Sequence, residues 1–337
     1  MKLLILGGTR FLGRHLVERA LARGHEVTLF NRGRTAPGLF PDVERLLGDR
    51  DGGLGVLDGR RWDAAIDTNG FFPRLVGASA ARLAGCVEHY AFVSSISVYA
   101  DPVPPGADET APVATLADPS DETMTADRYG ALKAASERAA EAAMPGRVLH
   151  VRAGLIVGPF DYTDRFPYWA RRLDRGGEVL APGTGGQAIQ WIDVRDLAEW
   201  MLDMAQRREA GVFNVTGPEE SCTLAGFLAQ ATAALGSGAT LRWVDEAFLI
   251  EQGVQPWSEL PLWAPGHDGF VRIRVARALA AGLRLRPLRE TLRDTLAWDL
   301  ARPAGTPRST ASMPMPESLT PEREADLLRQ WKARAAV

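Results

Sequence analysis

The chain has 337 residues, of which 46% are hydrophobic and 24% are charged, and its formal net charge is -3. This composition is typical of a globular protein with one large or two modest domains. The slightly acidic balance argues against a protein that holds a nucleic-acid backbone by charge.

Cysteine content and hydropathy limit the cellular setting. Cys86 and Cys222 belong to no spaced cluster, so we expect neither a disulfide framework nor a metal site. No apolar run approaches 18 residues, and Leu3–Leu6 is too short for a signal peptide. We therefore expect no membrane segment, no export and a cytoplasmic location.

Short apolar runs alternate with amphipathic stretches through the first half of the chain. This alternation indicates βαβ units and a parallel sheet. The runs lack an apolar–polar alternation, which indicates strands covered on both faces. The expected strands are Leu3–Leu6, Glu26–Asn31, Val43–Gly48, Trp62–Thr68 and His89–Ser95, and the expected helices are Phe11–Arg23 and Arg74–Ala84.

Residues 101–127 interrupt this rhythm with five prolines, seven acidic residues and no Lys or Arg. We expect a surface excursion there and not a packed element. Residues 302–319 are rich in Pro, Ser and Thr and predict a linker, after which Thr320-Pro321 begins a terminal helix to about residue 335. Between these segments we expect helices at Thr125–Ala143, Asp193–Arg207, Thr223–Leu235 and Leu288–Leu300, and strands at Arg147–Val157 and Gly211–Thr216.

The segment GGTRFLG, residues 7–13, follows the first strand and opens the first helix. In this context Gly7 permits a tight turn and Gly13 lets the helix pack on the sheet, while backbone N–H groups can hold a pyrophosphate. A glycine-rich turn without function is the alternative. The segment therefore predicts a dinucleotide site.

Three arginines bear on which dinucleotide is bound. Arg10 occupies the middle of the loop, where glycine is usual, and the second strand ends in Asn31 followed by Arg32 and Arg34. NAD-preferring sites place an acid at the end of that strand. We therefore favour NADP(H), with NAD(H) as the alternative and a solvated basic turn as the reading without function. Asp49 is a candidate hydrogen-bond acceptor for the adenine amine.

Tyr129 and Lys133 are four residues apart in the expected long helix, so both side chains lie on one face. An ammonium near the phenol favours tyrosinate and makes the tyrosine a proton donor or acceptor near neutral pH. Ser95 closes the strand HYAFVSS, at the carboxyl edge where ligands bind in open α/β sheets. There it can hydrogen-bond the reacting oxygen.

These motifs resemble those of an extended short-chain dehydrogenase/reductase of the NAD-dependent epimerase/dehydratase family. Four further segments share the resemblance: SVYA (97–100), RAGLIVGPFD (152–161), WIDVRDLA (191–198) and FNVTG (213–217). The resemblance covers roughly residues 1–300. It implies a catalytic set of Ser95, Tyr129 and Lys133. The predicted cofactor-binding residues are Gly7, Thr9, Arg10, Phe11, Leu12, Gly13, Asn31, Arg32, Asp49, Arg50, Thr68, Tyr129 and Lys133.

The resemblance also implies a Rossmann-type doubly wound parallel sheet with a smaller C-terminal α/β substrate lobe. We expect residues 1–160 to bind NAD(P) and residues 161–301 to bind substrate, with sheet-completing segments near 191–217. Residues 302–337 would form the linker and terminal helix. A homodimer through the Tyr129 helix is a further implication of the resemblance. We also expect a small-molecule substrate and, because of the acidic net charge and the Ser-Tyr-Lys set, no nucleic acid.

The chain departs from the family pattern at three places. Ser95-Ile96-Ser97 replaces the Thr-Asp-Glu of sugar dehydratases, which disfavours water elimination. Ile189 stands where nucleotide-sugar enzymes commonly carry an arginine, which weakens a nucleotide-sugar substrate unless Arg165 or Arg171 substitutes. The late region is also rich in tryptophan, which either walls a pocket or packs in the core: Trp169, Trp191, Trp200, Trp243, Trp257 and Trp263.

The sequence thus predicts an NAD(P)-dependent oxidoreductase that transfers hydride reversibly to a carbonyl or from a secondary alcohol. A sugar epimerase that uses the same residues for transient oxidation is the first alternative. The loop form GGTRFLG is also similar to that of chloroplast stem-loop RNA-binding proteins of the same fold, which makes RNA binding the second alternative.

Overall fold

The computed structural model describes residues 1–118, 120–220, 222–266, 268–303 and 317–335. The chain divides into two compact units. The first unit comprises residues 1–155, 194–219 and 273–285, and the second comprises residues 156–193, 220–272 and 286–337. The predicted split into cofactor-binding and substrate-binding domains stays a prediction about their roles.

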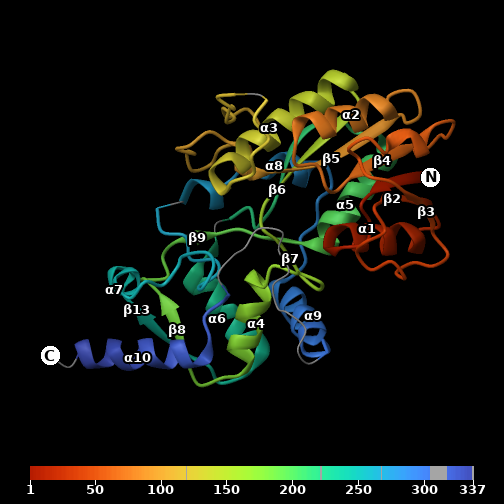
Figure 1. The fold of residues 1–337 in the computed structure, drawn as a ribbon. Helices are drawn as coiled ribbons and strands as arrows, with labels where there is room; N and C mark the ends of the chain where they lie inside the picture. Colours follow the sequence, from red (N-terminus) through yellow and green to blue (C-terminus); the bar gives the residue numbers. More distant parts are fainter. Residues whose placement is uncertain (119, 221, 267, 304–316, 336–337) are drawn as a thin grey trace. The chain divides into compact units, whose positions relative to one another are not determined.

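A seven-stranded parallel sheet forms the centre of the first unit (Figure 1). Its strand order is β11-β6-β5-β4-β1-β2-β3. The order reverses direction beside β1, where doubly wound sheets bind ligands at the carboxyl edge. The strands are β1 (Lys2–Leu6), β2 (Glu26–Asn31), β3 (Glu44–Leu47), β4 (Ala64–Asp67), β5 (His89–Ser95), β6 (Val148–Ala153) and β11 (Gly211–Val215).

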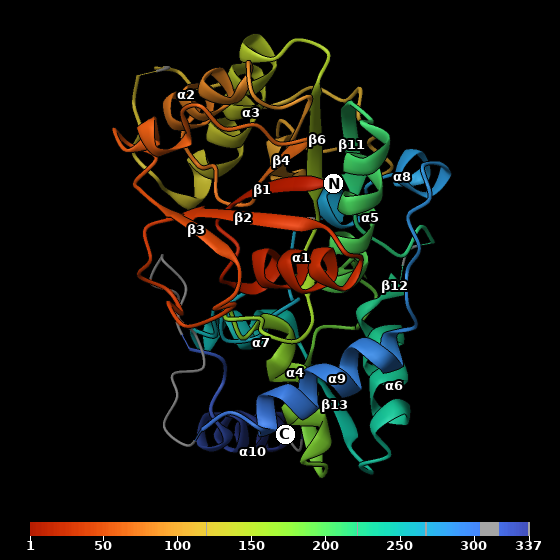
Figure 2. The ribbon, with the colours of Figure 1, turned by 90° about the vertical axis from the view of Figure 1, so that its right-hand side faces the viewer.

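Helices cover both faces of this sheet, as Figure 2 shows for the faces of β1 and β2. One face is covered by α1 (Phe11–Ala22) and α5 (Val194–Arg207), and the other by α2 (Pro73–Leu83) and α3 (Ala126–Ala143). The strands β1, β4, β5 and β6 at the centre of the sheet are almost wholly buried, which explains their largely apolar sequences. The predicted Rossmann-type α/β fold is therefore confirmed. The short helix α8 (Ala276–Ala280) packs near β11.

The predicted strand Arg147–Val157 is wrong in its extent. The structure breaks it into β6, in the central sheet, and β7 (Ile156–Val157), which pairs with β10 (Ile192–Asp193) in the second unit. Gly154 lies at the break, where a Cβ would overlap the hydroxyl group of Thr216. The close approach of the chain after β11 thus ends β6.

The acidic segment 101–127 is also more tightly packed than predicted. Val103 and Ala107 are buried, and the carbonyl of Ala107 accepts a hydrogen bond from the amide of Arg274. The carboxylate of Glu109 accepts the backbone amide of Asn214 at 2.8 Å. The segment lacks regular structure among its described residues up to α3, yet these contacts fasten it to the first unit.

The second unit contains small sheets and packed helices. Strand β8 (Glu178–Pro182) pairs with β13 (Thr240–Val244), and β9 (Ala188–Ile189) pairs with β12 (Cys222–Thr223). The helices are α4 (Arg165–Asp174), α6 (Leu224–Leu235), α7 (Glu246–Glu251), α9 (Leu288–Leu300) and α10 (Pro321–Ala335). The predicted linker falls mainly on residues 304–316, outside the described residues, and the terminal helix is present as predicted.

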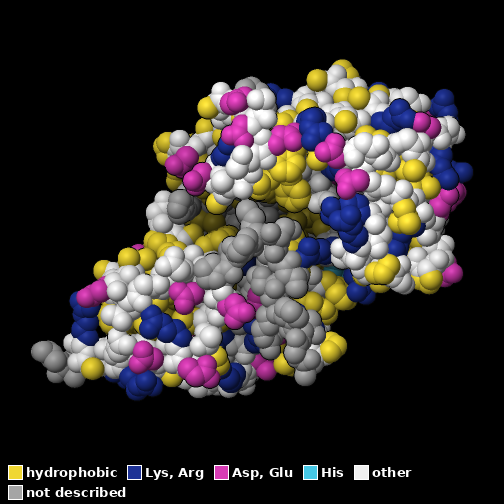
Figure 3. Space-filling view, in the orientation of Figure 1, with side chains coloured by type: hydrophobic (Ala, Val, Ile, Leu, Met, Phe, Trp, Pro, Cys, Tyr) yellow, Lys and Arg dark blue, Asp and Glu magenta, His cyan; other side chains and the backbone are white. Residues whose placement is uncertain are grey.

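Acidic and basic side chains are interspersed over the face shown in Figure 3. Among the described residues, none of the helices combines the length and the apolar character that crossing a bilayer requires.

Candidate active site

A glycine turn joins β1 to α1 at the carboxyl edge of the sheet. Gly7 and Gly8 have φ angles of 114° and 90°, which residues with a side chain rarely adopt. A Cβ on Gly13 would come within 2.7 Å of the Gly8 nitrogen, so α1 begins directly against the turn. The first turn of α1 carries no acidic residue. Because backbone N–H groups gather at the start of a helix, and no carboxylate opposes an anion here, this turn suits an anion such as a pyrophosphate.

The side chains of this turn divide into two groups. Phe11 and Leu12 are buried in the core, so only their backbone is available to a cofactor. Thr9 and Arg10 are half-buried beside them. Gly8 was absent from the predicted set. Its φ is positive and a Cβ there would overlap Leu29, so this position requires glycine as strongly as position 7 does. Sequence spacing alone did not single it out.

Asn31, at the end of β2, braces the glycine turn. Its side-chain amide donates to the carbonyl of Gly7 at 2.9 Å, and its oxygen accepts the amide of Gly33 at 2.9 Å. Arg32 follows on the surface, with its guanidinium 3.9 Å from the carboxylate of Asp49. Both side chains are about half exposed, so this ion pair is weak and leaves them accessible. The structure thus brings Asn31, Arg32 and Asp49 to the region beside the glycine turn.

The guanidinium of Arg50 is bound by other groups of the first unit. Its guanidinium is 2.5 Å from Asp67, 2.8 Å from the carbonyl of Asn69 and 3.0 Å from the hydroxyl of Ser79. The side chain is 12% exposed. The predicted contact of Arg50 with a cofactor stays a prediction, and its guanidinium is already bound to Asp67. Asp67 was absent from the predicted set, although an acid that ends an apolar strand was a usable signal.

Thr68 follows β4 and lies next to the glycine turn. Its hydroxyl donates to the carbonyl of Leu6 at 2.9 Å and faces the Cα of Gly7. A Cβ at Gly7 would overlap this hydroxyl, which is a second reason for glycine there. Thr68 thus shares the carboxyl edge with the predicted cofactor residues.

Ser95 ends β5 and caps the short turn Ile96–Val98. Its Oγ accepts the amide of Ser97 at 3.1 Å and lies 3.1 Å from the Ser97 hydroxyl. Ser94, beside it, is buried, and its Oγ has no hydrogen-bond partner among the described residues. The hydroxyl of Ser95 is therefore held at the edge of the sheet by its own turn.

Tyr129 and Lys133 lie on α3, which packs on the turn after β5. Gly130 permits this contact, because a Cβ there would overlap the carbonyl of Ser97. The ring of Phe71 lies 6.5 Å from the ring of Tyr129 and 5.6 Å from the Lys133 nitrogen. Phe71 is 41% exposed, and sequence reasoning missed it. It adds an apolar surface beside the two predicted catalytic groups.

Lys133 is buried one turn after Tyr129 on α3. Its Nζ donates to the carbonyls of Gly70 and Val93, each at 2.6 Å, and lies 4.2 Å from the centre of the Phe92 ring. Burial lowers the pKa of Lys133 to about 7, against the opposing effect of the negative charges of Asp67 and Glu137. The amine therefore exchanges a proton near neutral pH.

The remaining family-like motifs build a buried network in the first unit. The hydroxyl of Tyr99 donates to the side-chain oxygen of Asn214 at 2.6 Å, and the guanidinium of Arg152 lies 4.9 Å from the Tyr99 ring. Arg152 also pairs with Glu137 of α3 at 2.8 Å. This network ties α3 to β6 and β11, so these motifs support the position of Tyr129 and Lys133.

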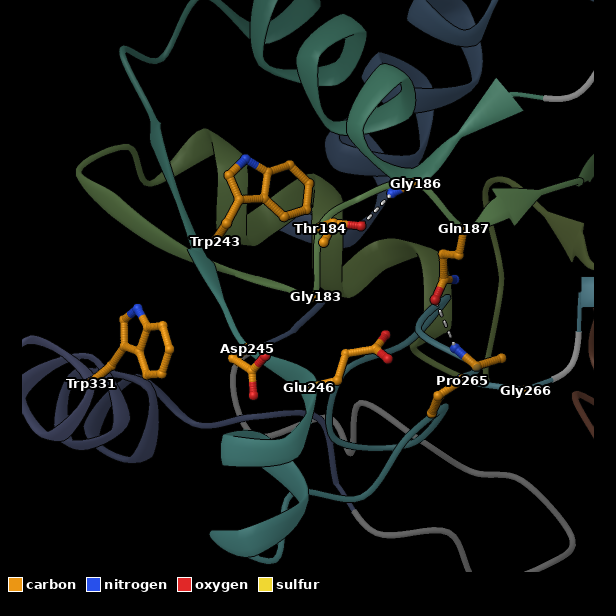
Figure 4. Close-up of a pocket in the computed structure, with 11 residues that line it drawn as sticks. Gly183, Thr184, Gly186, Gln187, Trp243, Asp245, Glu246, Pro265, Gly266 and Trp331 are labelled. Carbon is orange, nitrogen blue, oxygen red and sulfur yellow. Dashed lines mark hydrogen bonds between the residues drawn. The ribbon is translucent and has the colours of Figure 1, made fainter. Parts of the chain in front are cut away.

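A cavity of about 550 Å³ lies within the second unit (Figure 4). Trp243, Asp245, Glu246 and Gln187 line it, together with Trp331 of α10. Of the six late tryptophans, Trp243 lines this cavity, whereas three are buried in the core: Trp169, Trp200 and Trp263. The tryptophan-rich region therefore serves both packing and a cavity wall.

The two arginines suggested as substitutes for a family arginine differ in availability. Arg171 pairs with Asp164 at 2.8 Å and with Asp299 at 2.9 Å. Arg165 donates to the Thr163 hydroxyl at 3.0 Å and lies over the ring of Trp257. Arg171 is therefore bound by two carboxylates, and Arg165 is the freer of the two predicted substitutes. Within the described residues, no group of three or more His, Cys, Asp or Glu is placed to hold a metal ion.

The model of the NAD dependent epimerase/dehydratase family matches residues 3–47 and 63–216 of the chain. The chain belongs to this family. The matched residues include the glycine turn, Ser95, Tyr129 and Lys133. Membership confirms the predicted resemblance and, at the level of the family, the prediction of an NAD(P)-dependent enzyme.

The chain is also similar to individual known proteins. It is 30% identical over 254 residues to the chloroplast stem-loop binding protein of 41 kDa b from Arabidopsis thaliana. The matched residues cover 70% of this chain and 63% of that protein. The fold is similar to human epimerase family protein SDR39U1 with NADPH (24% identity, TM-score 0.61, 88% and 99% coverage). It is also similar to Thermus thermophilus UDP-glucose 4-epimerase with NAD (20% identity, TM-score 0.64, 90% and 100% coverage). The prediction of NADP(H), with NAD(H) as the alternative, agrees with these two complexes.

Proposed function

We propose that the protein is an NAD(P)-dependent oxidoreductase that transfers hydride reversibly to a carbonyl or from a secondary alcohol. The observation that carries this proposal is the position of Tyr129 and Lys133 on α3, with Lys133 buried among carbonyl groups at the carboxyl edge of the sheet. The glycine turn, which suits a pyrophosphate, lies along the same edge. The first unit therefore combines a proton-transfer group with a dinucleotide site.

The residues of the first unit fit the cofactor. Backbone N–H groups of the glycine turn would hold the pyrophosphate, since the first turn of α1 carries no acidic side chain that would repel it. Arg10 and Arg32 would meet a 2′-phosphate, which favours NADP(H) over NAD(H). When bound, the nicotinamide supplies or takes up the hydride.

Proton transfer is the task of Tyr129 in this proposal. Its phenol gives a proton to the carbonyl oxygen during reduction and takes it back during oxidation. The cationic form of Lys133 stabilises the tyrosinate, and a neutral Lys133 amine provides less of this effect. Ser95 donates a hydrogen bond to the same substrate oxygen and holds it toward the phenol.

Replacement of Tyr129 by Phe tests this assignment. We expect Tyr129→Phe to abolish NADP(H)-dependent turnover of carbonyl or alcohol substrates while the affinity for NADP(H), measured by fluorescence titration, stays within about twofold. Tyr168→Phe, which removes a buried phenol hydroxyl of α4 that has no hydrogen-bond partner among the described residues, is the matched control and should keep its turnover. Wild-type turnover in Tyr129→Phe would reject the assignment.

A sugar epimerase is the second candidate, and the similarity to the UDP-glucose 4-epimerase fold favours it. It would use Tyr129 in two opposite proton transfers, with no net consumption of cofactor. The absorbance of the nicotinamide band distinguishes the two functions. A net change with substrate supports the oxidoreductase, whereas substrate conversion with tightly retained cofactor and no net change supports the epimerase.

RNA binding is the third candidate because of the similarity to a stem-loop binding protein. The mixed charges on the face in Figure 3 and the net charge of -3 give little electrostatic support for it. Salt-dependent binding of an RNA stem-loop that is unaffected by Tyr129→Phe, in a protein without turnover, would favour this function over the oxidoreductase.

A further inference from the structure

Arg50 and Asp67 form a buried ion pair at the carboxyl end of β4. The carboxylate of Asp67 is fully buried and accepts hydrogen bonds from the two terminal nitrogens of Arg50, at 2.5 and 3.2 Å. It also accepts the hydroxyl of Tyr90 at 2.7 Å and the backbone amide of Asn69 at 3.0 Å. These bonds hold the pKa of Asp67 below its ordinary value in spite of burial.

The same ion pair fixes the turn that follows β4. Asp67 accepts the amide of Asn69, and Arg50 donates to the Asn69 carbonyl at 2.8 Å. The next residue, Gly70, is wedged between neighbouring elements, because a Cβ there would lie 2.5 Å from Phe92 and 2.6 Å from Val76. The carbonyl of Gly70 therefore has a defined position.

That carbonyl is one of the two hydrogen-bond acceptors of Lys133, at 2.6 Å. We propose that Arg50 and Asp67 are positioning residues, whose ion pair fixes the turn at residues 67–70 so that the Gly70 carbonyl holds the amine of Lys133 beside Tyr129. This inference rests on the function proposed above for Lys133, and it assigns Arg50 a task other than the predicted contact with the cofactor.

The charges around Lys133 predict the direction in which its pKa changes when Asp67 is replaced. The negative charges of Asp67 and of Glu137, which lies on α3 like Lys133, raise the pKa of Lys133, whereas Arg50 and burial lower it. The aromatic neighbours Phe71 and Phe92 carry no charge. Loss of the Asp67 carboxylate therefore lowers the pKa of Lys133 further. An arginine at position 133 would lack this behaviour, because its guanidinium stays protonated.

The chain contains three lysines, at positions 2, 133 and 332, so a lysine-labelled protein gives a simple carbon NMR spectrum. The signal of Lys133 is assigned by its loss in Lys133→Met, and its midpoint is followed from pH 5 to 11. In Asp67→Asn we expect the midpoint to fall by about 1 pH unit, the usual size for loss of a nearby opposite charge. The pH at which kcat/KM is half-maximal should move with it. Glu199→Gln, which removes the partner of Arg19 and Arg23, is the control and should leave the midpoint unchanged.

Asp67→Asn leaves Arg50 buried without its counter-charge and threatens folding. The double variant Arg50→Gln/Asp67→Asn removes both charges, and its Lys133 midpoint should also fall, by less than in the single variant. An unmoved midpoint in every folded variant overturns the proposal, whatever Tyr129→Phe does to turnover. A lowered midpoint in a protein without nicotinamide-dependent turnover supports the positioning role and rejects only the proposed function.

Discussion

Gly130 of α3 lies against the backbone carbonyl of Ser97, closely enough that a Cβ on Gly130 would overlap the oxygen. This contact joins the helix that carries Tyr129 to the turn that follows Ser95. The relative position of all three predicted catalytic groups, two on α3 and one before the turn, thus depends on a residue without a side chain. Close packing of this kind leaves little room to relax.

Gly130→Ala tests that contact. Forcing a methyl group into a packed site costs about 1–3 kcal/mol, so the free energy of unfolding should fall by this amount. Turnover should fall as well, because α3 must move away from the Ser95 turn. Chemical denaturation and steady-state kinetics measure the two effects. Gly85→Ala is the control, since a Cβ there meets nothing within 4 Å. Equal stability in the two variants would contradict the close contact.

Lys133 makes stability depend on pH. Its pKa is lowered to about 7 in the folded protein, against 10.5 for an ordinary lysine. Between these values the unfolded chain binds more protons than the folded one, so stability rises with pH. The full cost of charging Lys133 is present below pH 7 and vanishes above about pH 10.5.

We therefore expect Lys133→Met to be more stable than the wild type at pH 6, with the advantage shrinking toward pH 10. Urea unfolding of both proteins across this range measures the difference, in which the titration of all other groups largely cancels. Parallel stability curves would show that Lys133 titrates normally in the folded protein.

Much of the first unit was predictable because its strands are covered on both faces. Glu26–Asn31 and His89–Ser95 agree with the structure residue for residue. The break at Gly154 was not predictable, because it depends on the approach of Thr216 from a distant part of the chain. The strands β8 and β13 were missed as well, since each is a five-residue segment with few sequence signals.

The candidate site was predictable only where side chains follow a regular spacing. Tyr129 and Lys133 are recognised by their separation of four residues on one helix. The groups that hold Lys133 are backbone carbonyls, which carry no sequence signature. The pair of Arg50 and Asp67 joins the loop after β3 to the end of β4, and Phe71 comes from an irregular turn. Only the folded sheet brings these residues together.

Arg32 and Arg10 bear on the choice of cofactor. If the exposed guanidinium of Arg32 meets a 2′-phosphate, Arg32→Ala should weaken NADP(H) binding by about tenfold, as loss of a charge-assisted hydrogen bond does, and leave NAD(H) binding nearly unchanged. Arg10→Gly should reduce the same preference. Calorimetric titration of both cofactors measures it, with Arg60→Ala, which removes the partner of Glu44, as the control. Equal losses for both cofactors, or an unchanged preference, would refute a 2′-phosphate role.

Glu324 anchors the C-terminal helix α10 within the second unit. Its buried carboxylate accepts Arg172 Nε at 2.5 Å, Arg175 at 3.0 Å and the amide of Leu180 at 3.0 Å. Glu324→Gln removes the counter-charge of the buried Arg172, a loss that costs about 3–5 kcal/mol at buried pairs. We expect amide hydrogen exchange in α10 to accelerate by at least tenfold, as measured by mass spectrometry, while Glu322→Gln, an exposed neighbour on the same helix, changes it little. Unchanged protection of α10 in Glu324→Gln would mean that apolar contacts such as Phe248–Trp331 hold the helix without the ion pair.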